Sequence, residues 1–232
     1  MNAVEITGLR YSYPDGRPAL HGIDLIVREG ESVGLIGANG SGKTTLLLHL
    51  NGILRGTGSV RIFGMDPSGP DRAKVRAAVG VLFQDPEDQL FCPTVMEDAE
   101  FGPLNMGMDA AMARTRAREA LERVSMSAHA ERPPHHLSAG EKKRAALAAV
   151  VAVRPRILAL DEPSADLDPR SRREMIGLLK SFDGTRILAG HDLELIRGLC
   201  PRVILMNLGK ITADGPAGVI LDDRAFLEAS GL

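Results

Sequence analysis

The fold of this chain is decided by Val33-Gly34-Leu35-Ile36-Gly37-Ala38-Asn39-Gly40-Ser41-Gly42-Lys43-Thr44-Thr45. The first four residues are typical of a short buried strand, and a helical pattern of Leu46, Leu47 and Leu50 follows the glycine-rich loop. Between them, Gly37 to Thr44 fits the pattern G-x-x-x-x-G-K-[ST] in the strand-to-helix context that this pattern requires. The stretch therefore predicts a phosphate-binding loop.

The residues of this loop have separate predicted roles. Gly37, Gly40 and Gly42 let backbone N–H groups turn toward phosphate oxygens, and the helix that starts near Lys43 points its positive end at the same charge. We expect Lys43 to neutralise the β and γ phosphates. Thr44 is expected to offer its hydroxyl to Mg²⁺, a hard ion that takes oxygen ligands. Further contacts to phosphate are assigned to Asn39, Ser41 and Thr45.

Two other interpretations of the loop are weaker. A glycine-rich turn with an exposed lysine does not explain why a strand and a helix flank it. A dinucleotide-binding fold needs G-x-G-x-x-G, and the glycine spacing here differs.

The remaining pattern predicts an α/β fold with three parts. Residues 4 to 27 alternate like antiparallel strands around the turn Tyr13-Pro14-Asp15-Gly16. Further buried strands are predicted in a mostly parallel core sheet, and a helical face begins near Asp109. We expect one domain, in which 1–84 and 146–232 form the core with its β subdomain and 85–145 form an inserted helical subdomain. The predicted core strands are 79–83, 157–160, 186–189 and 203–206.

Two acids end the apolar strand Leu158-Ala159-Leu160, at the carboxyl edge where ligands collect in parallel sheets. Asp161 is expected to help hold Mg²⁺ through its water shell. Glu162 follows at a place where a carboxylate can orient and deprotonate a water that attacks the γ phosphate. An apolar-Asp-Glu string alone is weak evidence, so these roles depend on the phosphate loop.

Two polar residues after other strands complete the predicted catalytic set. His191 follows the strand 187–189 and could contact the γ phosphate, although a single histidine after a strand is usually structural. Gln84 closes the strand 79–83, and its amide could reach the metal and the attacking water. In isolation, neither residue would carry a functional assignment.

The composition excludes several classes of protein. The 232 residues have a formal net charge of −2, so no basic field is available for nucleic acid. Cys92 and Cys200 lie far apart without metal-site spacing, as in a reduced cytosolic protein. The longest apolar run, Ala145 to Val153, is well short of the ~20 residues that span a bilayer. Any membrane role must therefore come through a partner.

Leu137-Ser138-Ala139-Gly140-Glu141 resembles the LSGGQ signature of ATP-binding-cassette (ABC) ATPases and departs from it at Ala139 and Glu141. In that family two cassettes enclose two ATP molecules. The resemblance therefore implies that Ser138 and Gly140, at a helix N-terminus, bind the γ phosphate of ATP held by a second ATPase subunit. It also implies that ATP and Mg²⁺ are the cofactors; a homodimer is expected, with a heterodimer left open.

Other family motifs occur in family order along essentially the whole chain. Ser164-Ala165-Asp166-Leu167-Asp168 resembles the loop after the catalytic glutamate, and Gln84 and His191 match the switch positions. The family stacks adenine on an aromatic residue about 30 positions before the loop lysine, a separation at which Tyr13 lies. Tyr11 is the alternative for this role.

The resemblance is most specific to the energy-coupling-factor (ECF) branch of importers, through segments 85–91 and 97–103. In that branch the acidic segment docks a basic helix of a membrane scaffold subunit, which implies contacts through Asp85, Glu87 and Asp88 and an indirect link to a substrate-binding membrane subunit. Segments 191–195, 200–202 and 213–216 are similar to cobalt and nickel importers. The implied location is peripheral, at the cytoplasmic face of the cell membrane.

Three alternatives remain at this point. The importer could carry a vitamin such as biotin instead of a metal ion. A soluble cassette protein that acts on DNA or ribosomes would use the same site, although such proteins usually carry two cassettes or long inserts. A regulatory subunit without turnover is opposed by the presence of both Glu162 and His191.

Overall fold

A three-stranded antiparallel sheet opens the chain in the computed structural model, which describes residues 1–232 apart from the side chain of residue 229. Its order is β2-β1-β4, with β1 at Asn2–Ser12, β2 at Pro18–Arg28 and β4 at Thr57–Ile62. The antiparallel pairing of β1 with β2 confirms the strands predicted between residues 4 and 27. The strand β4 was not predicted, because its first residues are polar and only its last residue is buried.

The core sheet has the order β5-β6-β7-β3-β8-β9. The pairs β6–β7, β7–β3 and β3–β8 are parallel, which confirms the predicted mostly parallel sheet. The strand β9 runs antiparallel to β8 and was not predicted, because its residues alternate between exposed and half-buried positions. The strands are β3 at Ser32–Ile36, β5 at Val79–Leu82, β6 at Ile157–Asp161, β7 at Thr185–Ala189, β8 at Arg202–Asn207 and β9 at Lys210–Pro216.

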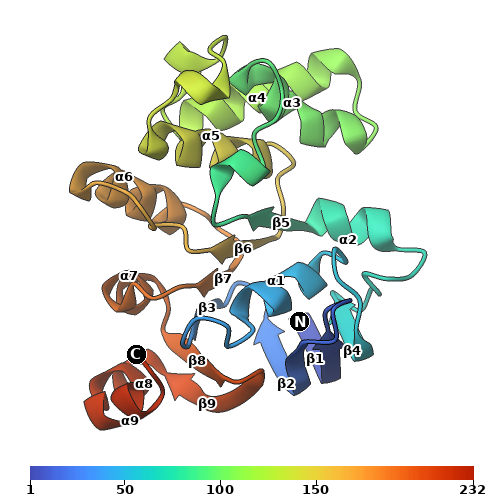
Figure 1. The fold of residues 1–232 in the computed structure, drawn as a ribbon. Helices are drawn as coiled ribbons and strands as arrows, with labels where there is room; N and C mark the ends of the chain where they lie inside the picture. The colour runs from blue at the N-terminus through green and yellow to red at the C-terminus, as the bar shows by residue number, and fades with distance from the viewer. The chain divides into compact units, whose positions relative to one another are not determined.

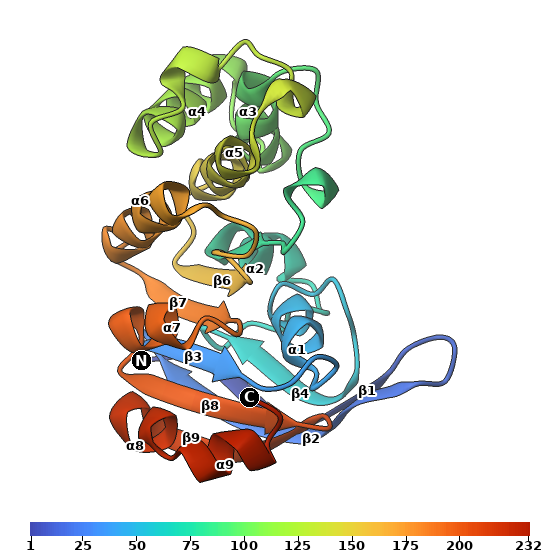
Figure 2. The ribbon, with the colours of Figure 1, turned by 60° about the vertical axis from the view of Figure 1, so that its left-hand side comes forward.

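Helices cover both faces of the core sheet (Figures 1 and 2), with α1 and α7 on opposite sides of β3. Gly34 in β3 makes room for α7, because a Cβ at this position would lie 2.4 Å from a methyl carbon of Ile196. The helices associated with the two sheets are α1 at Lys43–Leu50, α2 at Arg72–Ala78, α7 at Leu193–Leu199, α8 at Ala217–Asp222 and α9 at Arg224–Ala229.

The chain folds as two compact units, one of residues 1–81, 156–162 and 183–232, the other of residues 82–155 and 163–182. The first holds almost all of both sheets. The second is helical, with α3 at Val95–Asn105, α4 at Ala110–Arg123, α5 at Ala139–Val151, α6 at Pro169–Lys180 and the short 3₁₀ turns η1 at Pro86–Asp88, η2 at Ser127–His129 and η3 at Pro134–His136. The sequence-based limits of 85 and 145 for the helical subdomain stay a prediction.

Side-chain caps define where the helices of the second unit begin. Thr94, Asp109, Ser138 and Asp168 each accept a hydrogen bond from a backbone N–H in the first turn of the helix that follows. The apolar face predicted from Asp109 onward is present in α4, where Ala113, Ala117, Ala120 and Leu121 are buried. Among the described residues, no helix has the length and apolar character needed to cross a membrane.

Candidate functional site

The phosphate loop lies between β3 and α1, as predicted, and two of its glycines are sterically required. A Cβ at Gly37, where φ is +148°, would lie 2.1 Å from the carbonyl oxygen of Met206. Gly42, with φ of +102°, caps α1, and a Cβ there would lie 2.8 Å from the carbonyl oxygen of Ala19. The loop can therefore adopt this backbone conformation only with glycine at both positions.

Lys43 is folded back over this loop. Its Nζ donates to the carbonyl oxygens of Gly37 at 2.7 Å and Ala38 at 3.2 Å, and the residue is 7% exposed. Burial lowers the pKa of Lys43, and the carboxylates of Glu162 and Asp161 oppose this shift. A phosphate group would give this buried ammonium the charge partner that loop carbonyls do not supply.

Two hydroxyls of the loop suit a phosphate chain with a hard cation. Ser41 Oγ is buried and has no hydrogen-bond partner among the described residues. Thr44 is exposed in the first turn of α1, and Asp161 is 4% exposed at the end of β6. Hydroxyl and carboxylate oxygens are ligands that Mg²⁺ prefers, so these residues fit a magnesium–nucleotide complex.

Glu162 begins the loop after β6 in a left-handed backbone conformation, with φ of +45°. Its N–H donates to the carbonyl of Ala189 at 2.9 Å, which ties it to the end of β7. A Cβ at Gly190 would lie 3.0 Å from Glu162 Oε2, so glycine leaves the space that this carboxylate occupies. A non-glycine residue held in this conformation at a strand end is typical of functional sites.

His191 contacts two other predicted site residues, Glu162 and Asn39. Its N–H donates to Glu162 Oε2 at 3.3 Å, and its Nε2 lies 2.8 Å from Asn39 Oδ1 and 3.4 Å from Glu162 Oε1. Because the atoms next to Nε2 are a carboxylate oxygen and the side-chain oxygen of Asn39, the contacts favour the tautomer in which Nε2 carries the proton. The structure thus brings Glu162, His191 and the phosphate loop together within the first unit.

The structure distinguishes the two tyrosines considered for adenine. The Tyr13 hydroxyl lies 2.8 Å from Thr45 Oγ1 in α1, so this ring is held beside the phosphate loop. Tyr11 packs edge-on against His49, with ring centroids 5.0 Å apart, and against Tyr13 at 5.2 Å. Tyr13 is therefore the better placed of the two, and its contact with adenine stays a prediction.

Gln84 belongs to the second unit and lies two residues after the end of β5, not at its last position. Its backbone carbonyl accepts from Lys143 Nζ, and Lys143 is 3% exposed. The segment after it forms η1, which the Asp85 side chain caps by accepting from Glu87 N at 2.8 Å. The predicted contacts of the Gln84 amide with metal and water remain predictions.

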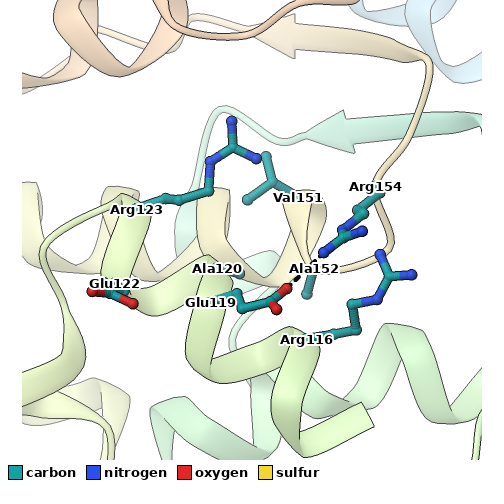
Figure 3. Close-up of a pocket in the computed structure, with 8 residues that line it drawn as sticks. All are labelled: Arg116, Glu119, Ala120, Glu122, Arg123, Val151, Ala152 and Arg154. Carbon is teal, nitrogen blue, oxygen red and sulfur yellow. Dashed lines mark hydrogen bonds and ion pairs between the residues drawn. The ribbon is translucent and has the colours of Figure 1, made fainter. Parts of the chain in front are cut away.

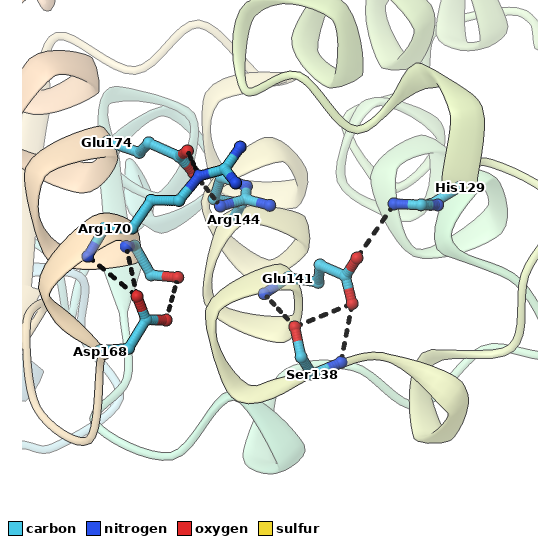
Figure 4. Close-up of polar contacts among 8 residues, drawn as sticks. His129, Ser138, Glu141, Arg144, Asp168, Arg170 and Glu174 are labelled. Carbon is cyan, nitrogen blue, oxygen red and sulfur yellow. Dashed lines mark hydrogen bonds and ion pairs between the residues drawn. The ribbon is translucent and has the colours of Figure 1, made fainter.

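The signature segment begins α5 and contains a capping box (Figure 4). Ser138 N donates to Glu141 Oε2 at 2.8 Å, and Glu141 N donates back to Ser138 Oγ at 3.4 Å. Gly140 faces α6, where a Cβ would lie 2.4 Å from Ser171 Oγ. The predicted helix N-terminus at Ser138 and Gly140 is therefore present, and its role toward phosphate remains a prediction.

The loop after Glu162 leads into α6, whose first turn Asp168 caps. Asp168 accepts from Ser171 Oγ at 2.6 Å and from two backbone N–H groups, and these bonds hold the pKa of its carboxyl below the usual range. Glu174 in α6 pairs with Arg144 in α5 at 2.6 Å and with Arg170 at 2.9 Å (Figure 4). The helices α5 and α6 are thus linked by this ion pair.

A pocket of about 370 Å³ in the helical unit contains none of the predicted site residues (Figure 3). It lies between α4 and the end of α5, where Glu119 pairs with Arg154 at 2.7 Å. Its lining is Arg116, Glu119, Ala120, Glu122, Arg123, Val151, Ala152 and Arg154.

A family model described as ABC transporter matches residues 20–165. The chain belongs to the ABC transporter family. Energy-coupling factor transporter ATP-binding protein EcfA of Methanothermobacter thermautotrophicus is 46% identical over 235 residues, which cover 99% of this chain and 76% of the relative. The ABC ATPase thus binds ATP and couples its hydrolysis to transport.

Two solved structures are similar to this ABC ATPase. CbiO1 of Clostridium perfringens, part of the ABC transporter complex CbiONQ, has a TM-score of 0.83 and 34% identity, with 98% of this chain and 94% of that chain covered. An ATP-binding cassette solved as a dimer in a post-hydrolysis state, with ADP and Pi, has a TM-score of 0.82 and 27% identity, with coverage of 92% and 98%. The predicted fold class is confirmed.

Sequence reasoning missed two partnerships at the sites of this ABC ATPase. It placed Asn39 in the phosphate loop but did not pair it with His191, which lies 152 residues away. It gave no role to His129, whose Nε2 lies 3.0 Å from Glu141 Oε1. No local pattern in the sequence signals either contact.

Proposed function

We propose that this chain is the ATP-hydrolysing subunit of an ECF-type importer, and that two ATPase subunits close on Mg-ATP to drive a membrane scaffold. The main support for ATP hydrolysis by this chain is the cluster of Glu162, His191 and Asn39 beside the buried Lys43. It places a carboxylate, an imidazole N–H and an ammonium at one edge of the core sheet.

Each member of the cluster has a distinct task in the proposed hydrolysis. Glu162 accepts a proton from the water that attacks the γ phosphate, and Lys43 stabilises negative charge on the β and γ phosphates. His191 is oriented by its hydrogen bond to Asn39 and would exchange this bond for one from Nε2–H to the γ phosphate. Gln84 adds an amide to the water and metal. Thr44 and Asp161 would hold Mg²⁺, which neutralises phosphate charge when bound.

A second ATPase subunit completes the proposed site. Ser138 and the N–H groups that follow it, with Gly140, bind the γ phosphate of ATP held by that partner. The similar cassette solved as a dimer supports this arrangement. A homodimer needs no other gene product, and a heterodimer would use the same residues.

The proposed scaffold surface is both acidic and apolar. Asp85, Glu87 and Asp88 lie in or beside η1, and Glu87 pairs with Lys142. Nearby in the chain, Phe91 is 63% exposed and packs edge-on against Phe101, which is 46% exposed. Exposed aromatic rings beside carboxylates suit a partner helix with basic and apolar residues. The chain would therefore sit peripherally at the cytoplasmic face of the membrane, linked only indirectly to the substrate-binding subunit.

Cobalt or nickel is the proposed cargo, supported by the similarity of segments 191–195, 200–202 and 213–216 to such importers and by the likeness to CbiO1. Among the described residues, no group of three or more histidine, cysteine, aspartate or glutamate side chains is placed to hold a metal ion. The cargo would therefore be selected by another polypeptide. A vitamin such as biotin is the alternative cargo.

Affinity co-purification from detergent-solubilised membranes tests this proposal. We expect the tagged chain to recover a scaffold subunit with basic loops and a second membrane subunit carrying Co²⁺ or Ni²⁺. Replacing Asp85, Glu87 and Asp88 with lysine should abolish recovery, whereas the control Glu122→Lys, elsewhere in the same unit, should not. Recovery of soluble partners alone would instead support a non-transport ABC ATPase.

A further inference from the structure

A network at the start of α5 connects Ser138 to His129 through Glu141 (Figure 4). Ser138 N and Oγ both donate to Glu141 Oε2 at 2.8 Å. The other carboxylate oxygen, Oε1, lies 3.0 Å from His129 Nε2. The side chains of His129 and Glu141 are 23% and 24% exposed, so the contact between them is partly shielded from solvent.

The hydroxyl hydrogen of Ser138 is committed to Glu141 in this arrangement. A hydroxyl has one hydrogen to donate, and phosphate oxygens accept hydrogen bonds. Ser138 Oγ can therefore donate to a phosphate only after its hydrogen turns away from Glu141 Oε2. The strength of the bond to Glu141 sets the cost of that turn.

A carboxylate at position 141 makes this cost larger than an amide would. The hydrogen bonds from Ser138 N and Oγ hold the pKa of the Glu141 carboxyl below its usual range, so the group is ionised at neutral pH. A full negative charge is a stronger acceptor than the neutral glutamine of the LSGGQ pattern. It also offsets the positive end of α5, which would otherwise attract phosphate.

His129 acts on the opposite side of the same carboxylate. Its Nε2 lies 3.0 Å from Oε1, within reach of a ring N–H, and its Nδ1 is buried with no hydrogen-bond partner among the described residues. A donor on Oε1 draws electron density from the carboxylate and weakens Oε2 as an acceptor for the Ser138 hydroxyl. It also fixes the carboxylate plane, since Glu141 is then held from both ends.

We propose that His129 is a positioning residue that acts through Glu141 to control how readily the Ser138 hydroxyl turns toward ATP bound by the partner ATPase subunit. This inference rests on the proposed function, in which Ser138 binds that phosphate. His129 would therefore help to set the ATP concentration at which the two subunits close.

ATP-driven dimerisation of the full chain, measured by light scattering, tests the inference. The parent is Glu162→Gln, which should retain ATP. In this background, His129→Leu should raise the ATP concentration for half-maximal dimerisation about fivefold. His129→Gln keeps an N–H donor and should stay within about twofold of the parent. Glu141→Gln should lower the ATP requirement and should cancel the effect of His129→Leu.

The outcomes separate the inference from the function on which it rests. A parent that dimerises with ATP while His129→Leu leaves the requirement unchanged overturns the inference alone. An equal shift caused by His129→Leu with and without Glu141→Gln also overturns it, because that shift would reflect general packing. A folded parent that stays monomeric at saturating ATP overturns both.

Discussion

The imidazole Nε2 of His191 lies 2.8 Å from the side-chain oxygen of Asn39, so the end of β7 is bonded directly to the phosphate loop. In this arrangement the ring N–H is donated to Asn39, and the same Nε2 lies 3.4 Å from Oε1 of Glu162, the proposed general base. His191, the proposed switch residue, is thus oriented by a residue of the phosphate loop.

Asn39→Ala should lower kcat about tenfold, because the His191 ring loses the acceptor that orients it. The effect on nucleotide affinity should be smaller, which steady-state kinetics and equilibrium ATP binding can separate. Adding Asn39→Ala to His191→Ala should cost little more than His191→Ala alone, since the two residues act as a unit. Additive losses would contradict the pairing.

Tyr13→Ala should weaken ATP binding about tenfold through loss of ring stacking, whereas Tyr13→Phe should retain most of the affinity. The hydroxyl bond to Thr45 is the only described side-chain contact that Tyr13→Phe removes. Tyr11→Ala should lower the thermal unfolding midpoint instead, because that ring packs against His49. Fluorescent-nucleotide titration and thermal unfolding of all three variants measure both effects. Weaker ATP binding in Tyr11→Ala, with affinity unchanged in Tyr13→Ala, would show that Tyr11 is the residue that stacks on adenine.

The stability of the nucleotide-free protein should depend on pH through Lys43. Its folded pKa is lowered by burial, so between that value and 10.5 the unfolded chain binds more protons than the folded one. The free energy of unfolding should therefore rise with pH in this window, relative to Lys43→Met, which has no proton to release. Denaturant unfolding of both proteins at pH 7 to 9.5 measures the difference, and parallel profiles would contradict it.

Gly140→Ala should disturb the start of α5, because the added Cβ would lie 2.4 Å from Ser171 Oγ and 2.8 Å from Ser171 Cβ. We expect about 1–3 kcal/mol of destabilisation from this overpacking. Ser171→Gly removes both clashing atoms and should recover part of the loss in the double variant. Chemical denaturation of the native protein, the two single variants and the double variant forms a double-mutant cycle. If Ser171→Gly recovers no stability in the Gly140→Ala background, the strain does not come from the contact with Ser171.

The phosphate loop shows what could be predicted from the sequence. Gly37 to Thr44 specify a short-range structure, since backbone conformation and the adjoining strand and helix are encoded by neighbouring residues. Buried strands such as β6 and β7 are equally visible, because both faces of a parallel sheet are covered. The strands β4 and β9 were missed because their partly exposed residues carry little apolar signal.

Contacts between side chains from different elements could not be predicted without the structure. Asn39 and His191 meet only because β3 and β7 are neighbours in the sheet, and strand order is not encoded in any local pattern. The choice between Tyr13 and Tyr11 likewise depends on one hydroxyl contact to α1. The pairing of His129 with Glu141 depends on where η2 brings the chain relative to α5.

The most direct test of the proposed catalytic site is the oligomeric state of Glu162→Gln at saturating Mg-ATP, measured by sedimentation with simultaneous quantification of bound nucleotide. The proposed mechanism predicts a dimer that retains two ATP molecules and dissociates to monomers when ADP replaces ATP. The added change Lys43→Ala should abolish both dimer and bound nucleotide. A well-folded Glu162→Gln protein that stays monomeric, or that hydrolyses ATP at the native rate, would contradict the proposed catalytic site.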